Sequence, residues 1–480
     1  MPPSSLILPS AAALLLVCHV WFYIRQPEPY MDELFHVPQA KEFCNAMSQK
    51  RIPFYDPSIT TPPGLYLPNF LLTLFTQNTT FCGTQWLRST SAVMSFLTLI
   101  LIRNLLCTLY QQYRDESSRE GKVNDPIDQH TVALLAFVIW LHPVNVFYAN
   151  LYYTDTTSLF WIVLLWTVIL KSNSFASAFL GVMASLSRQT NMVWHAYIVF
   201  DTFLNKEPLP NTLRPHNALL YFRKMMKANP WHIFAGVGYV LFIVTNGGVA
   251  IGDKSHHEVA LHQAMFAYFL AFHGSAFGLI QLSAFRDLLK TIRQLVCTFK
   301  LITTYWCVCA VLTAMVLATG EHAHPFILAD NRHFTFYVYR RWLLRSPWHR
   351  LCLVPVYGWF LMNPFLERIM PDGTPEESED NRCEWDSLLL SDLALLGCSY
   401  VTLVSSALLE PRYFTVPSIL FSIRRCARLK TKLSKRVLWI ISLGLVVLNI
   451  SFVYVFAELP FQRQVDNHMP RDLSPGRFMF

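Results

Sequence analysis

Charged side chains are scarce in this chain. They make up 15% of its 480 residues, whereas about 25% is usual in soluble globular proteins. Long polar stretches are missing as well, because the three longest, at about 111–130, 205–229 and 370–386, have only the size of loops. These two absences exclude a soluble globular fold and leave no separate soluble domain.

Three other signals are also missing. No C-x-x-C motif occurs, which argues against a structural zinc site. No internal repeat or low-complexity tract is present, although repeats are frequent in secondary transporters. The net charge of +8 does not indicate a nucleic-acid partner, since the basic residues are spread over short loops between apolar segments.

Apolar sequence, in contrast, accounts for 53% of the residues. A membrane-crossing helix needs about twenty apolar residues. Segments that approach this length lie near 5–24, 86–109, 131–149, 155–170, 175–189 with 191–204, 231–251, 260–282, 301–319, 351–369, 387–408, 412–423 and 437–457.

The first of these segments has neither a basic flank nor a small-residue cleavage site, so we interpret it as a retained span rather than a signal peptide. We predict an all-α polytopic membrane protein with one integral membrane domain over residues 1–480 and about 11–14 transmembrane helices.

Basic residues are concentrated in four loops, at 103–122, 206–227, 286–300 and 424–436. By the positive-inside rule these loops face the cytosol, which places residues 25–85, the first long loop, on the opposite side. That side then carries Asp32, Glu33, Asp155, His257, Glu258, Arg332, His333, Glu410 and Arg412. This coincidence predicts a functional site at that membrane face.

Arg340 and Arg341 do not fit this scheme, because their charge indicates the cytosolic side. A span at about 326–339 that reached this side would have to carry several charged and polar residues. We favour the alternative that this region forms a helix lying along the membrane surface.

The acidic pair Asp32–Glu33 directly follows the first apolar segment, and His36 comes one helical turn later. If this stretch is helical, Asp32 and His36 share a face while Glu33 points about a third of a turn away. One carboxylate can then meet a substrate while a neighbouring cation holds the other. The alternative is an acidic helix start that the helix dipole stabilises. A metal pair of Asp32 and His36 is less favoured, because no further ligands can be located.

Two other polar stretches allow both a functional and a structural interpretation. Thr60 and Thr61 precede a Pro-Pro-Gly turn. This turn either closes the first loop over a site or is only a structural turn within the loop. His257 and Glu258 lead into an apolar segment and either bind a phosphate or sugar or belong to a polar loop. Their spacing to His262 differs from the H-E-x-x-H zinc motif.

Two arginines stand at membrane edges, and a third lies within an apolar region. Arg332 precedes His333, Arg412 precedes Tyr413, and Arg188 interrupts an apolar region. Arginine binds phosphate with a two-pronged fork of N–H groups, and an arginine within a span usually faces a cavity or a partner. The alternative for Arg332 and Arg412 is that they extend from helix ends toward the interface.

Two further features lie in the first loop. Cys44 and Cys82 are the only plausible disulfide partners there, although we favour free thiols. Asn78 begins the sequon Asn78-Thr79-Thr80, which predicts N-glycosylation.

Several of these motifs together resemble one family. Tyr30-Met31-Asp32-Glu33-x-Phe35-His36-x-Pro38-Gln39-Ala40 resembles the signature of the endoplasmic-reticulum α-1,2-glucosyltransferases that complete the dolichol-linked oligosaccharide. Similar blocks are Asp56-Pro57-x-Ile59-Thr60-Thr61-x-Pro63-Gly64-Leu65-Tyr66, Arg188-Gln189-Thr190-Asn191, Asn246-Gly247 with Gly252-Asp253 and His257-Glu258, Leu328-Ala329-Asp330-Asn331-Arg332-His333-x-Thr335-Phe336-Tyr337, Arg412-Tyr413-Phe414 and Arg477-Phe478-Met479-Phe480. The blocks run in order from residue 30 to 480, so the resemblance covers nearly the whole chain.

The resemblance implies a GT-C-type glycosyltransferase in the endoplasmic-reticulum membrane, with its active site in the lumen. It would transfer glucose from dolichyl-phosphate glucose, in α-1,2 linkage, to the dolichyl-pyrophosphate-linked oligosaccharide Glc2Man9GlcNAc2. Because phosphate is already a good leaving group, one carboxylate base suffices, whereas glycosidases use two carboxyl groups. No cofactor or metal is expected.

In this resemblance the first lumenal loop, 25–85, carries the catalytic acid. Asp32 would be the base, with Glu33 as the second candidate. The residues expected to bind substrates are His36, Thr60, Thr61, Arg188, His257, Glu258, Arg332, His333, Arg412 and Tyr413. A multispan transporter and a non-catalytic membrane scaffold remain as alternatives.

Overall fold

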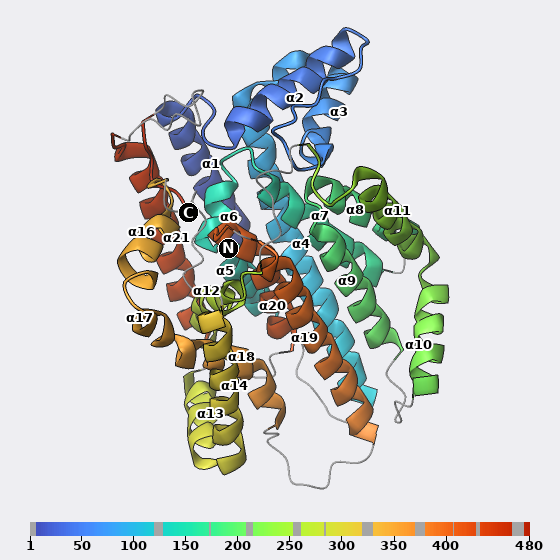
Figure 1. Cartoon of the computed structure of the whole chain (residues 1–480), viewed down its shortest axis with the longest axis vertical. Helices are drawn as coiled ribbons and strands as arrows, with labels where there is room; N and C mark the ends of the chain where they lie inside the picture. Colours follow the sequence, from blue (N-terminus) through green and yellow to red (C-terminus); the bar gives the residue numbers. More distant parts are fainter. Residues whose placement is uncertain are drawn as a thin grey trace.

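The computed structural model describes residues 6–119, 128–171, 174–207, 215–252, 261–282, 285–318, 330–369, 380–406, 408–428, 433–462 and 475–480. In these ranges the chain is mainly helical, and its only β-structure is two isolated bridges, His333 to Met479 and Phe461 to Gly476. Figure 1 shows a bundle of helices with the first long loop projecting from one end. The predicted all-α fold is confirmed.

The described helices are, in chain order, α1 (Ile7–Arg25), α2 (Glu33–Ser48), η2 (Pro63–Leu65), α3 (Leu67–Thr76), η3 (Thr79–Cys82), α4 (Thr84–Arg119), α5 (Gln129–Trp140), α6 (Pro143–Tyr148), α7 (Thr154–Leu170), α8 (Ser174–Ser187), α9 (Asn191–Lys206), α10 (Pro215–Ala228), α11 (Pro230–Asn246), α12 (Ala264–Leu282), α13 (Phe285–Cys297), α14 (Phe299–Ala318), α16 (Phe334–Val338), η4 (Tyr339–Leu343), α17 (Pro347–Leu351), α18 (Val354–Ile369), α19 (Asp380–Val404), η5 (Pro411–Phe414), α20 (Thr415–Ala427) and α21 (Lys435–Glu458).

Six helices of the described part are long and apolar enough to cross a membrane, namely α1, α4, α12, α14, α19 and α21. A seventh candidate is the pair α10 and α11, which is bent by 95° where Asn229 and Pro230 interrupt the helix. The expected 11–14 spans also include shorter apolar helices, such as α5, α7 and α8. The protein is therefore a multi-pass membrane protein.

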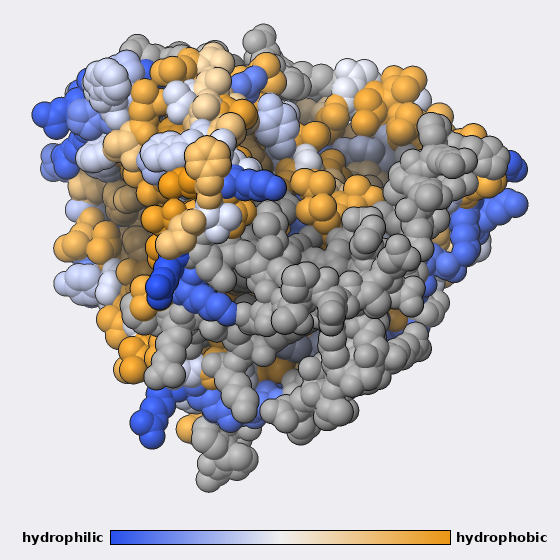
Figure 2. Space-filling view, turned by 90° about the horizontal axis from the view of Figure 1, so that it is seen from below, coloured by the Kyte–Doolittle hydropathy of each residue, from blue (hydrophilic) through white to orange (hydrophobic). Residues whose placement is uncertain are grey.

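The surface of the spanning helices carries large apolar side chains. Val17 of α1, Val311 of α14 and Leu443 of α21 are each more than half exposed. Figure 2, which views the end opposite α2 and α3, shows apolar residues over much of the described surface visible there. A surface with many exposed apolar side chains marks a region of contact with lipid or with another protein.

The interior is built around α5, where every residue from Val132 to Trp140 is buried. A helix that is apolar on all sides is stable only when other elements surround it, and α4, α20 and α21 pack against α5. The chain then continues through α6 to α7 and brings Tyr152, Tyr153 and Asp155 to the end of the bundle that carries α2.

Residues 334–351 form the short helices α16, η4 and α17. Each has five residues, far fewer than a bilayer crossing requires. The described part of 326–339 is thus not a spanning helix, and its position along the membrane surface stays a prediction.

The first loop is a folded unit made of α2, η2, α3 and η3. Cys44 of α2 and Cys82 of η3 form a disulfide, which corrects the expectation of free thiols. These residues are 38 positions apart, and they meet because α2 packs against both α3 and η3. No local pattern of residues indicates this packing.

Two glycines let this loop approach the bundle closely. A Cβ atom on Gly64 would lie 2.4 Å from the carbonyl carbon of Leu186 at the end of α8. Gly252 has φ of +68°, and a Cβ there would lie 2.3 Å from the carbonyl oxygen of Pro57. Neither position can take a larger residue without moving backbone.

Candidate active site

Asp32 immediately precedes α2, and its carboxylate faces Arg412 of η5. Arg412 Nη1 donates a hydrogen bond to Asp32 Oδ2 over 2.5 Å. The Asp32 side chain is 39% exposed and that of Arg412 is 13% exposed. Burial among neighbouring groups raises the pKa of Asp32, but the charge and hydrogen bond of Arg412 outweigh this and hold the pKa below its ordinary value. Asp32 is therefore an ionised carboxylate that a substrate can reach.

Arg412 also meets two other acids. It pairs with Glu410 and lies 3.9 Å from Asp155, which in turn pairs with Arg188. We call Asp32, Asp155, Arg188, Glu410 and Arg412 the charge cluster. Its residues come from the start of α2, the first turn of α7, the end of α8 and η5, so only the tertiary fold assembles it.

Two tyrosines pack against the guanidinium groups of the charge cluster. The Tyr413 ring centre is 5.0 Å from Arg188 Cζ and 5.5 Å from Arg412 Cζ. The Tyr153 ring centre is 5.4 Å from Arg412 Cζ. Such contacts restrict where the cations can turn, so the two arginines stay close together. A pair of neighbouring arginines matches the charge and shape of a phosphate group.

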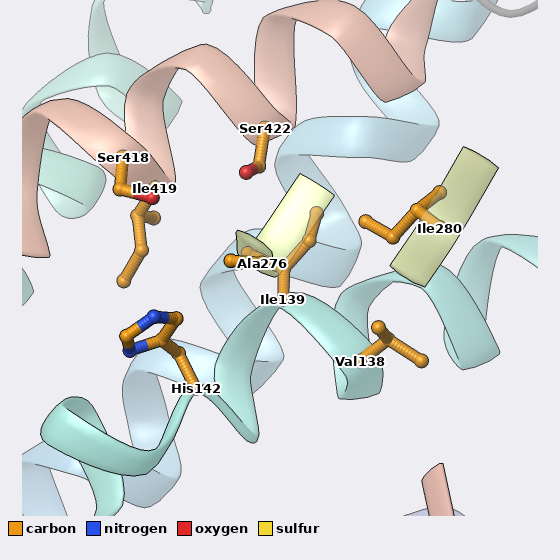
Figure 3. A pocket seen from close by; sticks show the side chains of 8 residues that line it. All are labelled: Val138, Ile139, His142, Ala276, Ile280, Ser418, Ile419 and Ser422. Carbon is orange, nitrogen blue, oxygen red and sulfur yellow. The ribbon is translucent and has the colours of Figure 1, made fainter. Parts of the chain in front are cut away.

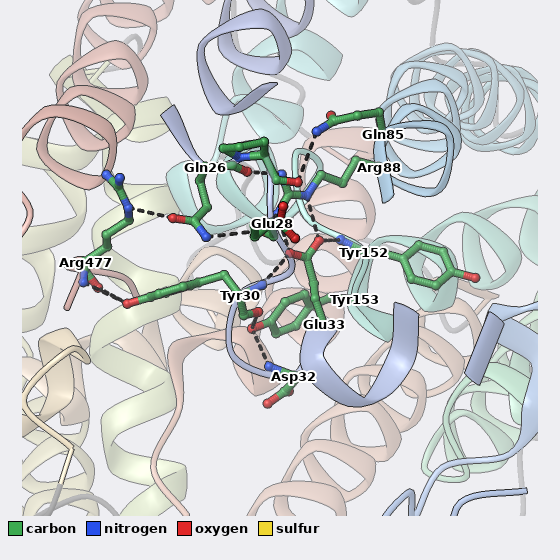
Figure 4. A network of polar contacts seen from close by, with 11 residues as sticks. Gln26, Glu28, Tyr30, Asp32, Glu33, Gln85, Arg88, Tyr152, Tyr153 and Arg477 are labelled. Atoms are coloured by element: carbon green, nitrogen blue, oxygen red, sulfur yellow. Dashed lines mark hydrogen bonds and ion pairs between the residues drawn. The ribbon is translucent and has the colours of Figure 1, made fainter. Parts of the chain in front are cut away.

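Glu33 lies in a very different environment, shown in Figure 4. Its side chain is fully buried and forms a two-pronged ion pair with Arg88, which is buried as well. The sequence predicted that one acid would be open while a cation holds the other. In the structure both acids pair with an arginine, and they differ in exposure, because Asp32 is 39% exposed and Glu33 is buried. Arg88 was missed, although it is the only charged residue between Thr84 and Ile102, which is an available signal.

Three predicted site residues in the first loop make mainly structural contacts. His36 Nδ1 lies 2.8 Å from the Tyr66 hydroxyl, and burial lowers the pKa of His36. The Thr60 carbonyl oxygen accepts hydrogen bonds from Gln189 Nε2 and Ile251 N, and the Thr61 carbonyl accepts one from the Tyr55 hydroxyl. The Thr60 contacts fasten the first loop to Gln189, next to Arg188, and to Ile251, whereas the Thr61 contact lies within the loop.

Arg332 and His333 lie outside the charge cluster, although the charge of His333 contributes to the lowered pKa of Asp32. Arg332 donates to both carboxylate oxygens of Asp330, at 2.8 and 2.7 Å, and its guanidinium lies 5.7 Å from the Tyr30 ring centre. His333 Nδ1 lies 3.0 Å from the carbonyl oxygen of Phe480. The side chain of Arg332 is only 3% exposed, so it is less accessible than Arg412.

Of the remaining predicted positions, the structure describes Asn78 but not His257 and Glu258. His257 and Glu258 lie outside the described residues. Asn78 is exposed, and its side chain accepts a hydrogen bond from Thr80 N, so no described packing covers the sequon. The acidic insert at 371–384 lies mostly outside the described residues as well.

A small cavity between α5, α12 and α20 is a separate feature (Figure 3). His142, Ser418 and Ser422 provide its polar atoms, and the other lining residues are Val138, Ile139, Ala276, Ile280 and Ile419. It contains no carboxylate or arginine, so it is not the candidate active site. Within the described ranges, no three side chains of His, Cys, Asp or Glu converge as a metal site requires.

The helical bundle and the charge cluster at one of its ends define an all-α, multi-pass membrane protein with a candidate enzymatic site. A sequence model of the DIE2/ALG10 family matches residues 26–423. The chain therefore belongs to the DIE2/ALG10 family.

Named relatives agree with this assignment. An Arabidopsis thaliana protein is 29% identical over 84% of this chain and 87% of its own length, and a Homo sapiens protein is 27% identical over 94% and 93%. A Drosophila melanogaster protein is 28% identical over 90% of each. All three are named Dol-P-Glc:Glc(2)Man(9)GlcNAc(2)-PP-Dol alpha-1,2-glucosyltransferase. No solved structure matches the chain.

Proposed function

We propose that this protein transfers glucose from dolichyl-phosphate glucose, in α-1,2 linkage, to Glc2Man9GlcNAc2-PP-dolichol. The names of the relatives support the reaction and both lipid-linked substrates. The observation that supports its location in the fold is the accessible Asp32 carboxylate beside Arg412. A transporter is less favoured, because the charge cluster lies at the end of the bundle that carries α2 and the named relatives are transferases.

The proposed reaction is a single inverting displacement. The acceptor hydroxyl oxygen attacks C1 of glucose while the bond from C1 to the phosphate oxygen breaks, and dolichyl phosphate leaves with the bonding electrons. Asp32 takes the hydroxyl proton. Attack opposite the phosphate converts the β-linked donor into an α-linked product. The leaving phosphate needs no general acid, and we propose no cofactor or metal.

Arg412 and Arg188 are the proposed phosphate ligands. As the bond to C1 breaks, negative charge grows on the phosphate, and fixed cations stabilise that charge. Arg412 is paired with Asp32 before substrate arrives. A donor phosphate at Arg412 competes with this pairing and releases the Asp32 carboxylate toward the acceptor. Donor binding and activation of the base are thus linked.

We place the active site in the lumen of the endoplasmic reticulum. The basic loops orient residues 25–85 away from the cytosol. The disulfide between Cys44 and Cys82 supports this side, since disulfides persist in oxidising compartments.

The test uses purified protein, dolichyl-phosphate glucose and lipid-linked glycans that end in one, two or three glucoses. We expect one glucose to be added only to the acceptor with two, in α-1,2 linkage. Transfer to a different acceptor would correct the substrate assignment, and absence of transfer to all three would contradict the function.

A further inference from the structure

Arg88 is a fully buried cation next to the proposed base. It is the fifth residue of α4, and its side chain is 0% exposed. Its Nε and Nη2 donate to the two oxygens of Glu33 at 2.9 and 2.5 Å. Its Nη1 and Nη2 also donate to the carbonyl oxygens of Gln26 and Glu28, at 2.5 and 3.0 Å. One guanidinium therefore joins the segment after α1 to the start of α2 (Figure 4).

Glu33 is held from further directions. Its Oε1 accepts a hydrogen bond from Tyr152 N at 2.7 Å, and its Oε2 accepts one from Tyr30 N at 3.0 Å. Together with Arg88, each carboxylate oxygen accepts two hydrogen bonds. Glu33 is sealed from solvent and already bonded on both oxygens, so it is poorly placed to take a proton from a substrate.

The turn that carries Asp32 is fixed by the same contacts. Met31 has φ of +55°, a conformation that residues with side chains rarely adopt. On one side Tyr30 N is bonded to Glu33, and on the other Asp32 N donates to the Tyr153 hydroxyl at 3.2 Å. An uncommon backbone conformation persists where its surroundings determine it. Only the carboxylate of Asp32 projects from this fixed turn toward Arg412.

We propose that Arg88 is a positioning residue, which sets the place of the Asp32 carboxylate through Glu33 and the carbonyls of Gln26 and Glu28. This inference rests on the proposed function. A misplacement of about 1 Å at a reacting group can slow catalysis roughly 10²-fold. Loss of the Arg88 contacts therefore slows the chemical step, while Arg188 and Arg412 still bind the donor.

The first variant is Arg88→Lys, which keeps the charge but cannot make all four contacts. Glucose transfer per folded molecule should fall roughly 10- to 100-fold in kcat, with little change in the KM for the donor. Hydrogen exchange at the amides of Tyr30 and Asp32 should become faster, because their turn opens more often.

A matched control is Arg424→Lys. Arg424 is also buried, but it pairs with Asp201 and Asp392 between α9, α19 and α20. This variant should lower the thermal midpoint and leave kcat per folded molecule unchanged, with no effect on exchange at Tyr30. An equal loss of kcat in both variants would show a general loss of structure and would overturn the proposal.

The outcomes separate this proposal from the proposed function. A wild-type protein that transfers no glucose contradicts the function, whereas an active wild type with an equally active Arg88→Lys variant contradicts only the positioning role. If Arg88→Lys does not fold, the double variant Glu33→Gln with Arg88→Gln removes both buried charges and leaves neither unpaired. It should show the same slow kcat and fast exchange, and wild-type kcat in it would overturn the proposal.

Discussion

Asp32 and Glu33 are adjacent in the chain, yet their side chains meet different arginines and different amounts of solvent. Glu33 is buried against Arg88, while the Asp32 carboxylate is partly exposed beside Arg412. A carboxylate that accepts a substrate proton must be within reach of that substrate. The structure therefore favours Asp32 as the base and Glu33 as a residue that holds the turn.

Asp32→Asn should remove the base while preserving the shape of the side chain. We expect transfer to fall by about 10²–10⁴-fold. Donor binding should become tighter, because the phosphate no longer competes with a carboxylate for Arg412. Single-turnover transfer and a donor titration on the same preparation measure both effects.

Two outcomes would contradict the assignment of Asp32. Near wild-type transfer by Asp32→Asn, together with an inactive Glu33→Gln, would give the role of base to Glu33. Activity in both single variants would exclude this acidic pair as the catalytic site.

Arg412 and Arg332 should differ as phosphate ligands. Arg412 is the more exposed and packs with Arg188 against Tyr413, whereas Nε and Nη2 of Arg332 already donate to the Asp330 carboxylate. A charge-assisted contact is worth about 1.5–3 kcal/mol, so Arg412→Lys should reduce transfer at low donor concentration by about 10- to 150-fold. Arg332→Lys should have a smaller effect. Initial rates over a donor series test this order, and the reverse order would move the phosphate site to Arg332.

At the scale of elements, the first loop is held both covalently and by packing. The disulfide joins α2 to η3, the Thr60 carbonyl accepts a hydrogen bond from Gln189 outside the loop, and the Thr61 carbonyl accepts one from Tyr55 within it. This arrangement matters for function because α2 begins at Asp32. A loop that loosens will also loosen the position of the base.

Removal of the disulfide by Cys44→Ser should destabilise the first loop. Closing a loop of this length stabilises a protein by about 4 kcal/mol in the chain-entropy description. We expect faster proteolysis between α2 and η3 and a lower thermal midpoint than in the wild type, with Cys297→Ser, an exposed free cysteine, as the control. If mass spectrometry without reduction finds Cys44 and Cys82 as free thiols, the disulfide is absent from the protein.

At the scale of the whole molecule, the orientation across the membrane can be tested at Asn78. If residues 25–85 are lumenal, the exposed sequon is open to glycosylation. Peptide-N-glycosidase should then shift the mobility of the wild type but not of Asn78→Gln. Cleavage of this loop by protease added outside sealed microsomes would contradict the orientation.

Much of the fold follows from local sequence. In lipid every backbone N–H and C=O must be paired within the protein, so long apolar segments form helices, and helices occur where α1, α4, α12, α14, α19 and α21 were expected. The structure of the region around Arg340 was harder to predict from the sequence. Its short helices contain both apolar and charged residues, and none has the length of a membrane span.

The sequence by itself determined the membrane character, the family motifs and the candidate site residues, because these depend on composition and short spacings. Only the tertiary structure decided which partner each residue has. Asp32 meets Arg412 across 380 positions, Glu33 meets Arg88 across 55, and Cys44 meets Cys82 across 38. Such pairings depend on how whole helices pack, and no local pattern of residues encodes that packing.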